Sequence, residues 1–108
     1  MKRRILLSIP AANDLSDIND YYLTEVSDAV AARIIDRLEQ AVNSLENMPD
    51  RGSVPKELLN IGIRQYRQII QKPYRIIYEP FEKKVIVHAI LDGRRDMQTL
   101  LSRRMLRD

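Results

Sequence analysis

The spacing of apolar residues changes near the middle of the chain, and this change restricts the possible folds more than any other feature. From Ala11 to Leu45 apolar side chains recur every three or four residues, which is the period of amphipathic helices. Beyond residue 62 they occur in short runs rich in β-branched and aromatic residues, which is typical of strands. The sequence therefore predicts helices and a sheet in separate segments, an α+β architecture.

Two helices are expected in the first half. A short apolar strand over residues 3–9 precedes Pro10, which suits the first turn of a helix that ends near Thr24. Ser27 and Asp28 supply an N-cap and an acidic first turn for a second helix over 28–47. Because only about three residues separate the helices, we expect an antiparallel hairpin whose apolar stripes face each other and a sheet.

The second half predicts a three-stranded meander. Turn residues, including Lys72-Pro73, separate three strand-like runs over 64–71, 74–79 and 85–91. The last run has apolar residues at both odd and even positions, which predicts a central strand covered on both faces.

A closing helix is expected after a turn at Asp92-Gly93, because Met97, Leu100 and Leu101 follow with helical spacing. The full order is then β-α-α-β-β-β with a C-terminal helix, in a single domain over residues 1–108. The helix hairpin packs on an antiparallel-rich sheet.

Composition excludes several classes of protein. The chain has no Cys, so it has no disulfide framework, thiolate nucleophile or Cys-based metal site, and we expect no metal or cofactor. Hydrophobic residues make up 44% of the chain and charged residues 31%, which is typical of a soluble globular domain. No apolar run is long enough to predict a membrane span or a signal peptide. The expected location is the cytoplasm, with no membrane partner.

Charge is unevenly distributed along the chain. The formal charge is −3 over residues 1–60 and +6 over residues 61–108. Thirteen of the 18 basic residues are Arg, whose planar guanidinium binds phosphate and carboxylate in a bidentate manner. This pattern predicts a basic face formed by the C-terminal half and an acidic partner.

Several local sequences resemble one known family. They are Ala-Ala-Asn-Asp-Leu-Ser-Asp-Ile-Asn-Asp-Tyr at 11–21, Tyr-Arg-Gln-Ile at 66–69, Pro-Tyr-Arg-Ile-Ile-Tyr at 73–78 and Val-His-Ala-Ile-Leu-Asp-Gly-Arg-Arg-Asp at 87–96. In this order and spacing they cover nearly the whole chain and resemble toxins of the RelE/ParE superfamily, the toxic halves of type II toxin–antitoxin modules.

The resemblance implies two alternative activities on one fold, so the fold alone does not decide between them. RelE-like members are ribosome-dependent endoribonucleases that cut mRNA, whereas ParE-like members poison DNA gyrase by trapping its cleaved-DNA complex. Both bind a cognate antitoxin, and the pair contacts operator DNA only through the antitoxin. Growth inhibition and plasmid stabilization are the roles this implies. A degenerate toxin that only binds an antitoxin is a third alternative.

The ribonuclease alternative would use Arg67, Arg75, His88 and Arg94. Arg67 and Arg75 match positions where that branch often has phosphate-stabilising arginines, and the strand order allows both to converge with Arg94 and Arg95 at one end of the sheet. For His88, which lies within an apolar strand, we favour a buried or half-buried structural residue over a base. Tyr66, Tyr74 and Tyr78 are possible acids in this alternative, but each also suits a packing role on a strand face, which is the favoured interpretation.

The ParE-like alternative is favoured. Ribonuclease members commonly have a Tyr or His near the C-terminus, whereas this chain has neither after His88 and continues through residues 92–96 into a helix. A gyrase poison needs no catalytic residue of its own. We therefore favour a protein that is not an enzyme, and the ribonuclease remains the enzymatic alternative. The basic face that would bind the target or the antitoxin comprises Arg67, Arg75, Arg94, Arg95, Arg103 and Arg104.

Overall fold

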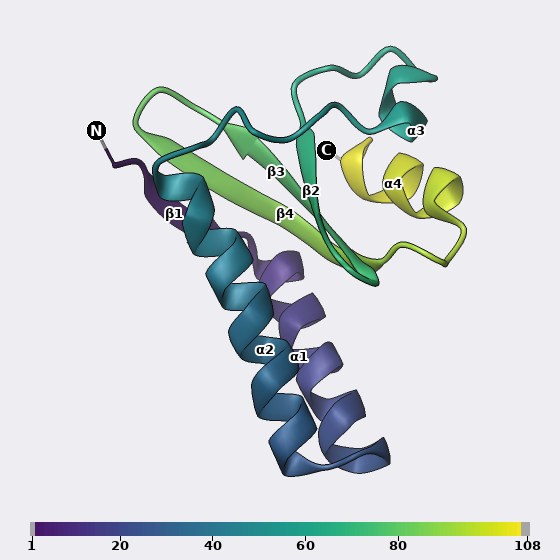
Figure 1. Cartoon of the computed structure of the whole chain (residues 1–108). Helices are drawn as coiled ribbons and strands as arrows, with labels where there is room; N and C mark the ends of the chain where they lie inside the picture. Colours follow the sequence, from purple (N-terminus) through teal and green to yellow (C-terminus); the bar gives the residue numbers. More distant parts are fainter. Residues whose placement is uncertain (1, 107–108) are drawn as a thin grey trace.

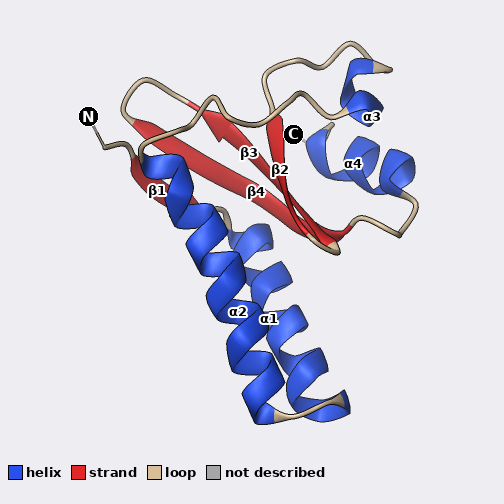
Figure 2. Cartoon of the chain, viewed as in Figure 1, coloured by secondary structure: helices blue, strands red, loops and turns tan. Residues whose placement is uncertain are grey.

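A computed structural model describes residues 2–106 (Figures 1 and 2). A helix hairpin covers one face of a four-stranded sheet, and two shorter helices cover part of the other face. In chain order the elements are β1 (Arg4–Leu7), α1 (Ile9–Glu25), α2 (Asp28–Asn43), the 3-10 turn η1 (Ser44–Glu46), α3 (Lys56–Leu59), β2 (Arg67–Gln71), β3 (Tyr74–Pro80), β4 (Lys84–Asp92) and α4 (Met97–Met105). The predicted α+β order is confirmed.

The sheet has the strand order β1-β4-β3-β2. β4 pairs in parallel with β1 and antiparallel with β3, which in turn pairs antiparallel with β2. β4 therefore lies inside the sheet, and buried residues of β4 face both sides, as its apolar pattern predicts. The antiparallel-rich sheet is confirmed.

The helix hairpin forms the larger core with one face of the sheet. Ser8 and Ser27 cap α1 and α2, each by accepting a hydrogen bond from a backbone N–H of the first turn. Side chains of both helices and of η1 pack against strand residues on this face, among them Ala11, Leu38, Leu45, Ile76, Tyr78 and Val87. Beyond the end of the sheet the hairpin continues away from it (Figure 1).

The helices α3 and α4 cover part of the opposite face. Leu58 of α3 packs with Ile77, Ala89 and Leu91 of the sheet and with Leu101 of α4, all of them buried. Helix α3 falls in a segment expected to be a loop, because a four-residue helix gives no periodic signal. The sequence favours packing of Leu58, Leu59 and Ile61 onto the core, but only Leu58 is buried, whereas Leu59 and Ile61 are exposed.

The segment before β2 is held against the edge of the sheet. The Tyr78 hydroxyl donates to the carbonyl of Pro49 at 2.7 Å and accepts from the N–H of Gly52 at 3.1 Å. A Cβ atom at residue 52 would lie 2.3 Å from the Gln68 carbonyl oxygen, so only glycine allows this approach. The predicted first meander strand was too long at its start, since β2 begins at Arg67 and not at residue 64.

The second helix is also shorter than predicted. It ends at Asn43, and the apolar pattern that continues to residue 47 belongs to η1, which buries Leu45. A 3-10 turn continues a helical pattern for a few residues, so periodicity alone does not separate the two. Within residues 2–106 no helix combines the length and apolar character that a membrane crossing requires.

Candidate functional site

One edge of β4 lacks a strand neighbour over its second half. Pairing with β1 ends at Leu7 and Val87, and the register with β3 shifts so that His88 has no opposite residue, which is a β-bulge. The carbonyl of His88, at the bulge, and the N–H of Ile90, just beyond it, therefore form hydrogen bonds with side chains and not with a neighbouring strand. Such backbone groups need partners when they are shielded from water.

Asp14 and Arg104 supply those partners. The Asp14 carboxylate of α1 accepts from the Ile90 N–H at 3.0 Å and from two Arg104 nitrogens at 3.0 and 3.3 Å. The Arg104 guanidinium of α4 donates in turn to the His88 carbonyl at 2.9 Å. This ion pair therefore joins α1, β4 and α4, with side-chain exposures of only 15% and 19%.

Arg75 is bound within the chain by a carboxylate. Its guanidinium forms a bidentate pair with the buried Glu57 of α3, at 2.7 and 2.9 Å, and donates to Gln68 at 2.7 Å. The hydrogen bonds from Arg75 lower the pKa of Glu57 from its ordinary value, although burial acts in the opposite direction. Arg75 thus anchors α3 to the sheet.

The predicted convergence of four arginines at one end of the sheet is wrong. Arg67 lies opposite Tyr78 at one end of the β2–β3 ladder, whereas Arg75 lies near the other end and close to Gly93. Arg67 donates to the Gly52 carbonyl at 2.6 Å, because the turn before β2 folds back over it. The antiparallel register places the starts of two consecutive strands at opposite ends, which separates Arg67 from Arg75.

The arginines that follow β4 differ in whether a carboxylate pairs with them. Arg94 is exposed but binds Asp92 through two guanidinium hydrogen bonds, which lower the pKa of Asp92. Arg95 and Arg103 are exposed, and neither forms an ion pair within residues 2–106. Of the six arginines predicted to form a basic face, these two are exposed and form neither a side-chain hydrogen bond nor an ion pair within residues 2–106, whereas Arg67 lacks an ion pair but is bound by backbone carbonyls.

His88 belongs to a cluster on the face of the sheet that also bears α4, which we call the His88 cluster and define as Tyr66, Glu79 and His88. The His88 Nε2 atom lies 2.9 Å from the Glu79 carboxylate, and its ring meets Tyr66 edge to face with centroids 5.3 Å apart. The prediction that His88 is half-buried and hydrogen-bonded in the sheet is confirmed. Sequence reasoning missed Glu79, because only the β3–β4 register brings it beside His88.

The tyrosines considered as acids have elevated pKa values. Burial raises the pKa of Tyr66, with a further contribution from the nearby Glu79 charge. Burial is also the main reason that the pKa values of Tyr74 and Tyr78 are raised. The packing interpretation is confirmed for Tyr74 and Tyr78, both buried, whereas Tyr66 is half-buried beside His88. Among the described residues no group of three or more His, Asp or Glu side chains is placed to hold a metal ion.

The sequence matches a family model over most of its length. The model describes the ParE toxin of the type II toxin-antitoxin system parDE and matches residues 5–97. The chain therefore belongs to the ParE toxin family, in agreement with the resemblance found in its motifs. The match ends where α4 begins, so Arg103 and Arg104 lie beyond it. A comparison with curated proteins finds no match.

Two solved structures share the fold. One is the chromosomal ParDE system from P. aeruginosa, at 16% identity and a TM-score of 0.68, covering 82% of this chain and 94% of that chain. The other is the RelBE2 toxin-antitoxin complex from Mycobacterium tuberculosis, at 15% identity and a TM-score of 0.59, covering 85% and 92%. At these identities the likeness concerns the fold alone, and it includes both branches of the superfamily.

The Asp14 and Arg104 pair predicts a strong energetic coupling between α1 and α4. Replacing either residue by alanine leaves a largely buried partner charge and is expected to lower the free energy of unfolding by about 2 kcal/mol. The loss of unfolding free energy in the double variant should be clearly smaller than the sum of the losses in the two single variants, as measured by urea unfolding in a double-mutant cycle. Asp17→Ala, on the same helix but exposed, is the matched control; additive effects of the two changes would contradict the coupling.

The Glu57 and Arg75 pair predicts a pH dependence of stability. Because the pKa of Glu57 is lower in the folded chain than its ordinary value of 4.5, the pair stabilises the fold above that value. This contribution is lost as the pH falls through the folded pKa. Below about pH 5, the free energy of unfolding measured with urea should therefore decrease more steeply with falling pH for wild type than for Glu57→Gln. Glu82→Gln, at an exposed position, should keep the wild-type profile. Parallel profiles for wild type and Glu57→Gln would contradict the assignment.

Proposed function

We propose that this toxin inhibits DNA gyrase by trapping its complex with cleaved DNA, that it acts in the cytoplasm, and that a cognate antitoxin neutralises it. One observation favours this function over ribonuclease activity: the arginines predicted to stabilise a phosphorane are separated and held by other groups. Arg75 binds Glu57, Arg94 binds Asp92, and Arg67 binds a backbone carbonyl. A gyrase poison does not need such a cluster, because the bond-breaking chemistry belongs to gyrase. The ParE family match supports the same choice.

Arg95 and Arg103 are the basic residues best suited to contact the target. Arg95 lies just before α4, and Arg103 lies in its last turn. Neither forms an ion pair within residues 2–106. Phosphate oxygens of DNA or carboxylates of a protein surface would complement them. Arg104 is assigned a structural role, since Asp14 and the His88 carbonyl occupy its guanidinium.

The gyrase proposal predicts that purified toxin blocks supercoiling of relaxed plasmid and increases gyrase-dependent DNA cleavage. The variant Arg95→Glu/Arg103→Glu should need about ten times more protein for the same inhibition, because two attractive contacts become repulsive. Arg33→Glu/Arg37→Glu, at exposed positions on α2, is the matched control and should inhibit like wild type. Gyrase left untouched by an excess of folded toxin would rule out the proposal.

A second candidate function rests on the His88 cluster. The Glu79 carboxylate orients the His88 ring, and the ring of the half-buried Tyr66 lies on the same face. In a ribosome-dependent endoribonuclease, His88 would accept the proton of the RNA 2′-hydroxyl as its oxygen attacks phosphorus, while Tyr66 protonates the departing 5′-oxygen. The raised pKa of Tyr66 keeps its hydroxyl protonated, as a donor requires.

The ribonuclease candidate is tested with translating ribosomes and a defined mRNA. If it is correct, toxin cuts the mRNA, and His88→Ala and Tyr66→Phe each reduce the rate at least about a hundredfold, since each removes a proton-transfer group. Tyr74→Phe, which also loses a hydroxyl but lies in the core, should keep near-normal activity. Intact mRNA after incubation with wild-type toxin would eliminate this candidate.

A further inference from the structure

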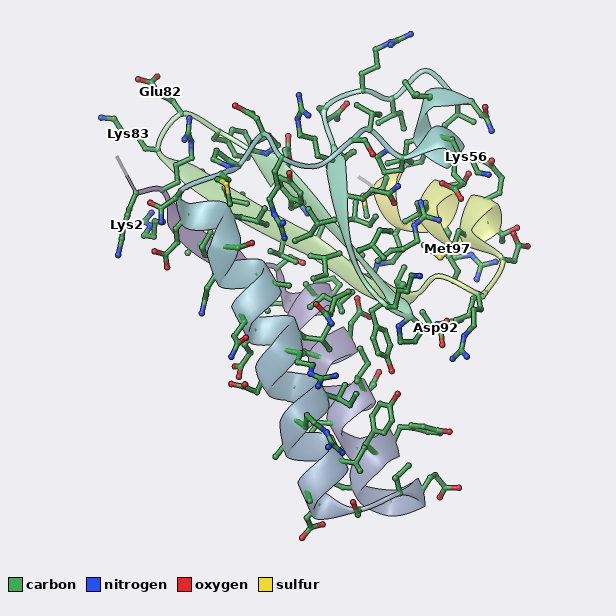
Figure 3. The ribbon with its side chains drawn as sticks, in the orientation of Figure 1. Lys2, Lys56, Glu82, Lys83, Asp92 and Met97 are labelled. Carbon is green, nitrogen blue, oxygen red and sulfur yellow. The ribbon has the colours of Figure 1, made fainter. Side chains whose placement is uncertain are left out.

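A second cluster of positive charge lies where β1 and β4 begin. We call it the basic corner and define it as Lys2, Arg3, Arg4, Lys83 and Lys84. The parallel pairing of β1 with β4 forms it, since Arg4 lies beside Lys84 and its N–H donates to the Lys83 carbonyl at 3.1 Å. Figure 3 shows Lys2 and Lys83 projecting from this corner. Lys84 and Asp92 are the two ends of β4, so about 26 Å separates the corner from the end of the sheet that leads to α4.

The basic corner is not apparent in the sequence, because residues 2–4 belong to the half of the chain that has a net negative charge. Two carboxylates accompany it: Glu46 pairs with Lys2 at 3.7 Å, and Glu82 precedes Lys83 in the turn. With both included, the corner keeps a net formal charge of +3. The other three exposed or half-exposed cations, Arg4, Lys83 and Lys84, form no ion pair within residues 2–106. These three are available to an external anion.

The side chains of Arg4 and Lys84 are neighbours of like charge. They are partners in the β1–β4 register, so they lie on the same face of the sheet, and like charges on adjacent strands repel each other. A charge on an edge strand prevents aggregation, which explains Arg4 on β1. It does not explain Lys84, because β4 is an inner strand. Positions that break a local rule without a structural gain are typical of functional surfaces.

Contacts within the chain hold the corner in shape. The Arg3 Nε atom donates to the Phe81 carbonyl at 2.9 Å, which ties the start of β1 to the turn before β4. The Lys84 amine lies 5.4 Å from the centre of the Phe81 ring, a cation–π contact that positions the amine at the surface. A ligand therefore meets cations that are already arranged and loses little binding free energy in ordering them.

The chemistry of the corner favours a dense row of anions. Duplex DNA has one negative charge about every 1.7 Å along its axis, whereas an extended acidic peptide has one about every 3.3 Å. Arg4 and Lys84 are on neighbouring strands about 4.8 Å apart, so closely spaced anions satisfy both and relieve their repulsion. Arg and Lys side chains contact phosphate oxygens without reading the base sequence. Charge density thus favours duplex DNA over a protein partner.

We propose that the basic corner binds the phosphate backbone of duplex DNA directly, without gyrase and without base specificity. Arg4, Lys83 and Lys84 each contact one phosphate. In the complex of gyrase with cleaved DNA, the corner holds the toxin on the DNA, and to that extent the inference rests on the proposed function.

The test measures fluorescence anisotropy of a labelled DNA duplex titrated with the full chain at low salt, with no gyrase present. Because each neutralised phosphate releases counterions, the logarithm of the association constant should fall with the logarithm of the salt concentration, with a slope of about −3 for three contacts. The variant Arg4→Gln/Lys83→Gln removes two contacts, so its slope should be about −1 and its affinity about tenfold weaker.

Two controls separate the corner from total charge and from folding. Arg33→Gln/Arg37→Gln removes the same charge at exposed positions on α2 and should bind the duplex like wild type. In urea unfolding, Arg4→Gln/Lys83→Gln should be at least as stable as wild type, because it removes the repulsion between Arg4 and Lys84. Its weaker DNA binding would then come from lost contacts and not from unfolding.

Several results would overturn the inference. They are no binding of the duplex at low salt, a wild-type salt slope for Arg4→Gln/Lys83→Gln, or tighter binding of polyglutamate of equal charge. Tighter binding of single-stranded RNA of equal charge would instead assign the corner to RNA. Loss of duplex binding in Arg95→Gln/Arg103→Gln alone would assign the DNA contact to the region beside α4. A toxin that binds the duplex through the corner but leaves gyrase untouched contradicts the proposed function and supports this inference, so the two failures are distinguishable.

Discussion

The unpaired edge of β4 is the constraint on which the rest of the structure depends. β1 is too short to pair with all of β4, and the bulge at His88 leaves backbone groups facing away from β3. The Asp14 and Arg104 side chains satisfy them, and they come from helices at opposite ends of the chain. The same bonds therefore complete the sheet, fix α1 against it and hold α4 in position.

This constraint also determines which positive charges are available for binding. The C-terminal half is strongly basic, but Arg104 stabilises the edge of β4 and Arg75 stabilises α3. A guanidinium that is bound by a carboxylate and shielded from water contributes little attraction for a distant phosphate. Of the six arginines predicted to form a basic face, Arg95 and Arg103 keep exposed charges without an ion pair within residues 2–106, so this face is narrower than the charge count suggests.

Family membership and fold leave the target undecided, because the fold is shared with both a ParDE and a RelBE toxin-antitoxin structure. The distinguishing features are local. The separated arginines favour a toxin that acts by binding its target, whereas the ribonuclease candidate depends on the contact between His88 and Glu79.

The sequence by itself determined the order of the elements, the hairpin and the central position of β4, because periodicity and turn residues are local properties. It also predicted that His88 is half-buried and hydrogen-bonded in the sheet. It did not reveal α3, which is too short to give a periodic signal. It also missed the position of Glu79 beside His88 and the separation of Arg67 from Arg75, which depend on strand register. Only the tertiary structure decided which arginines are free, because the partners of Arg104 and Arg75 lie 90 and 18 residues away in the chain and no local pattern links them.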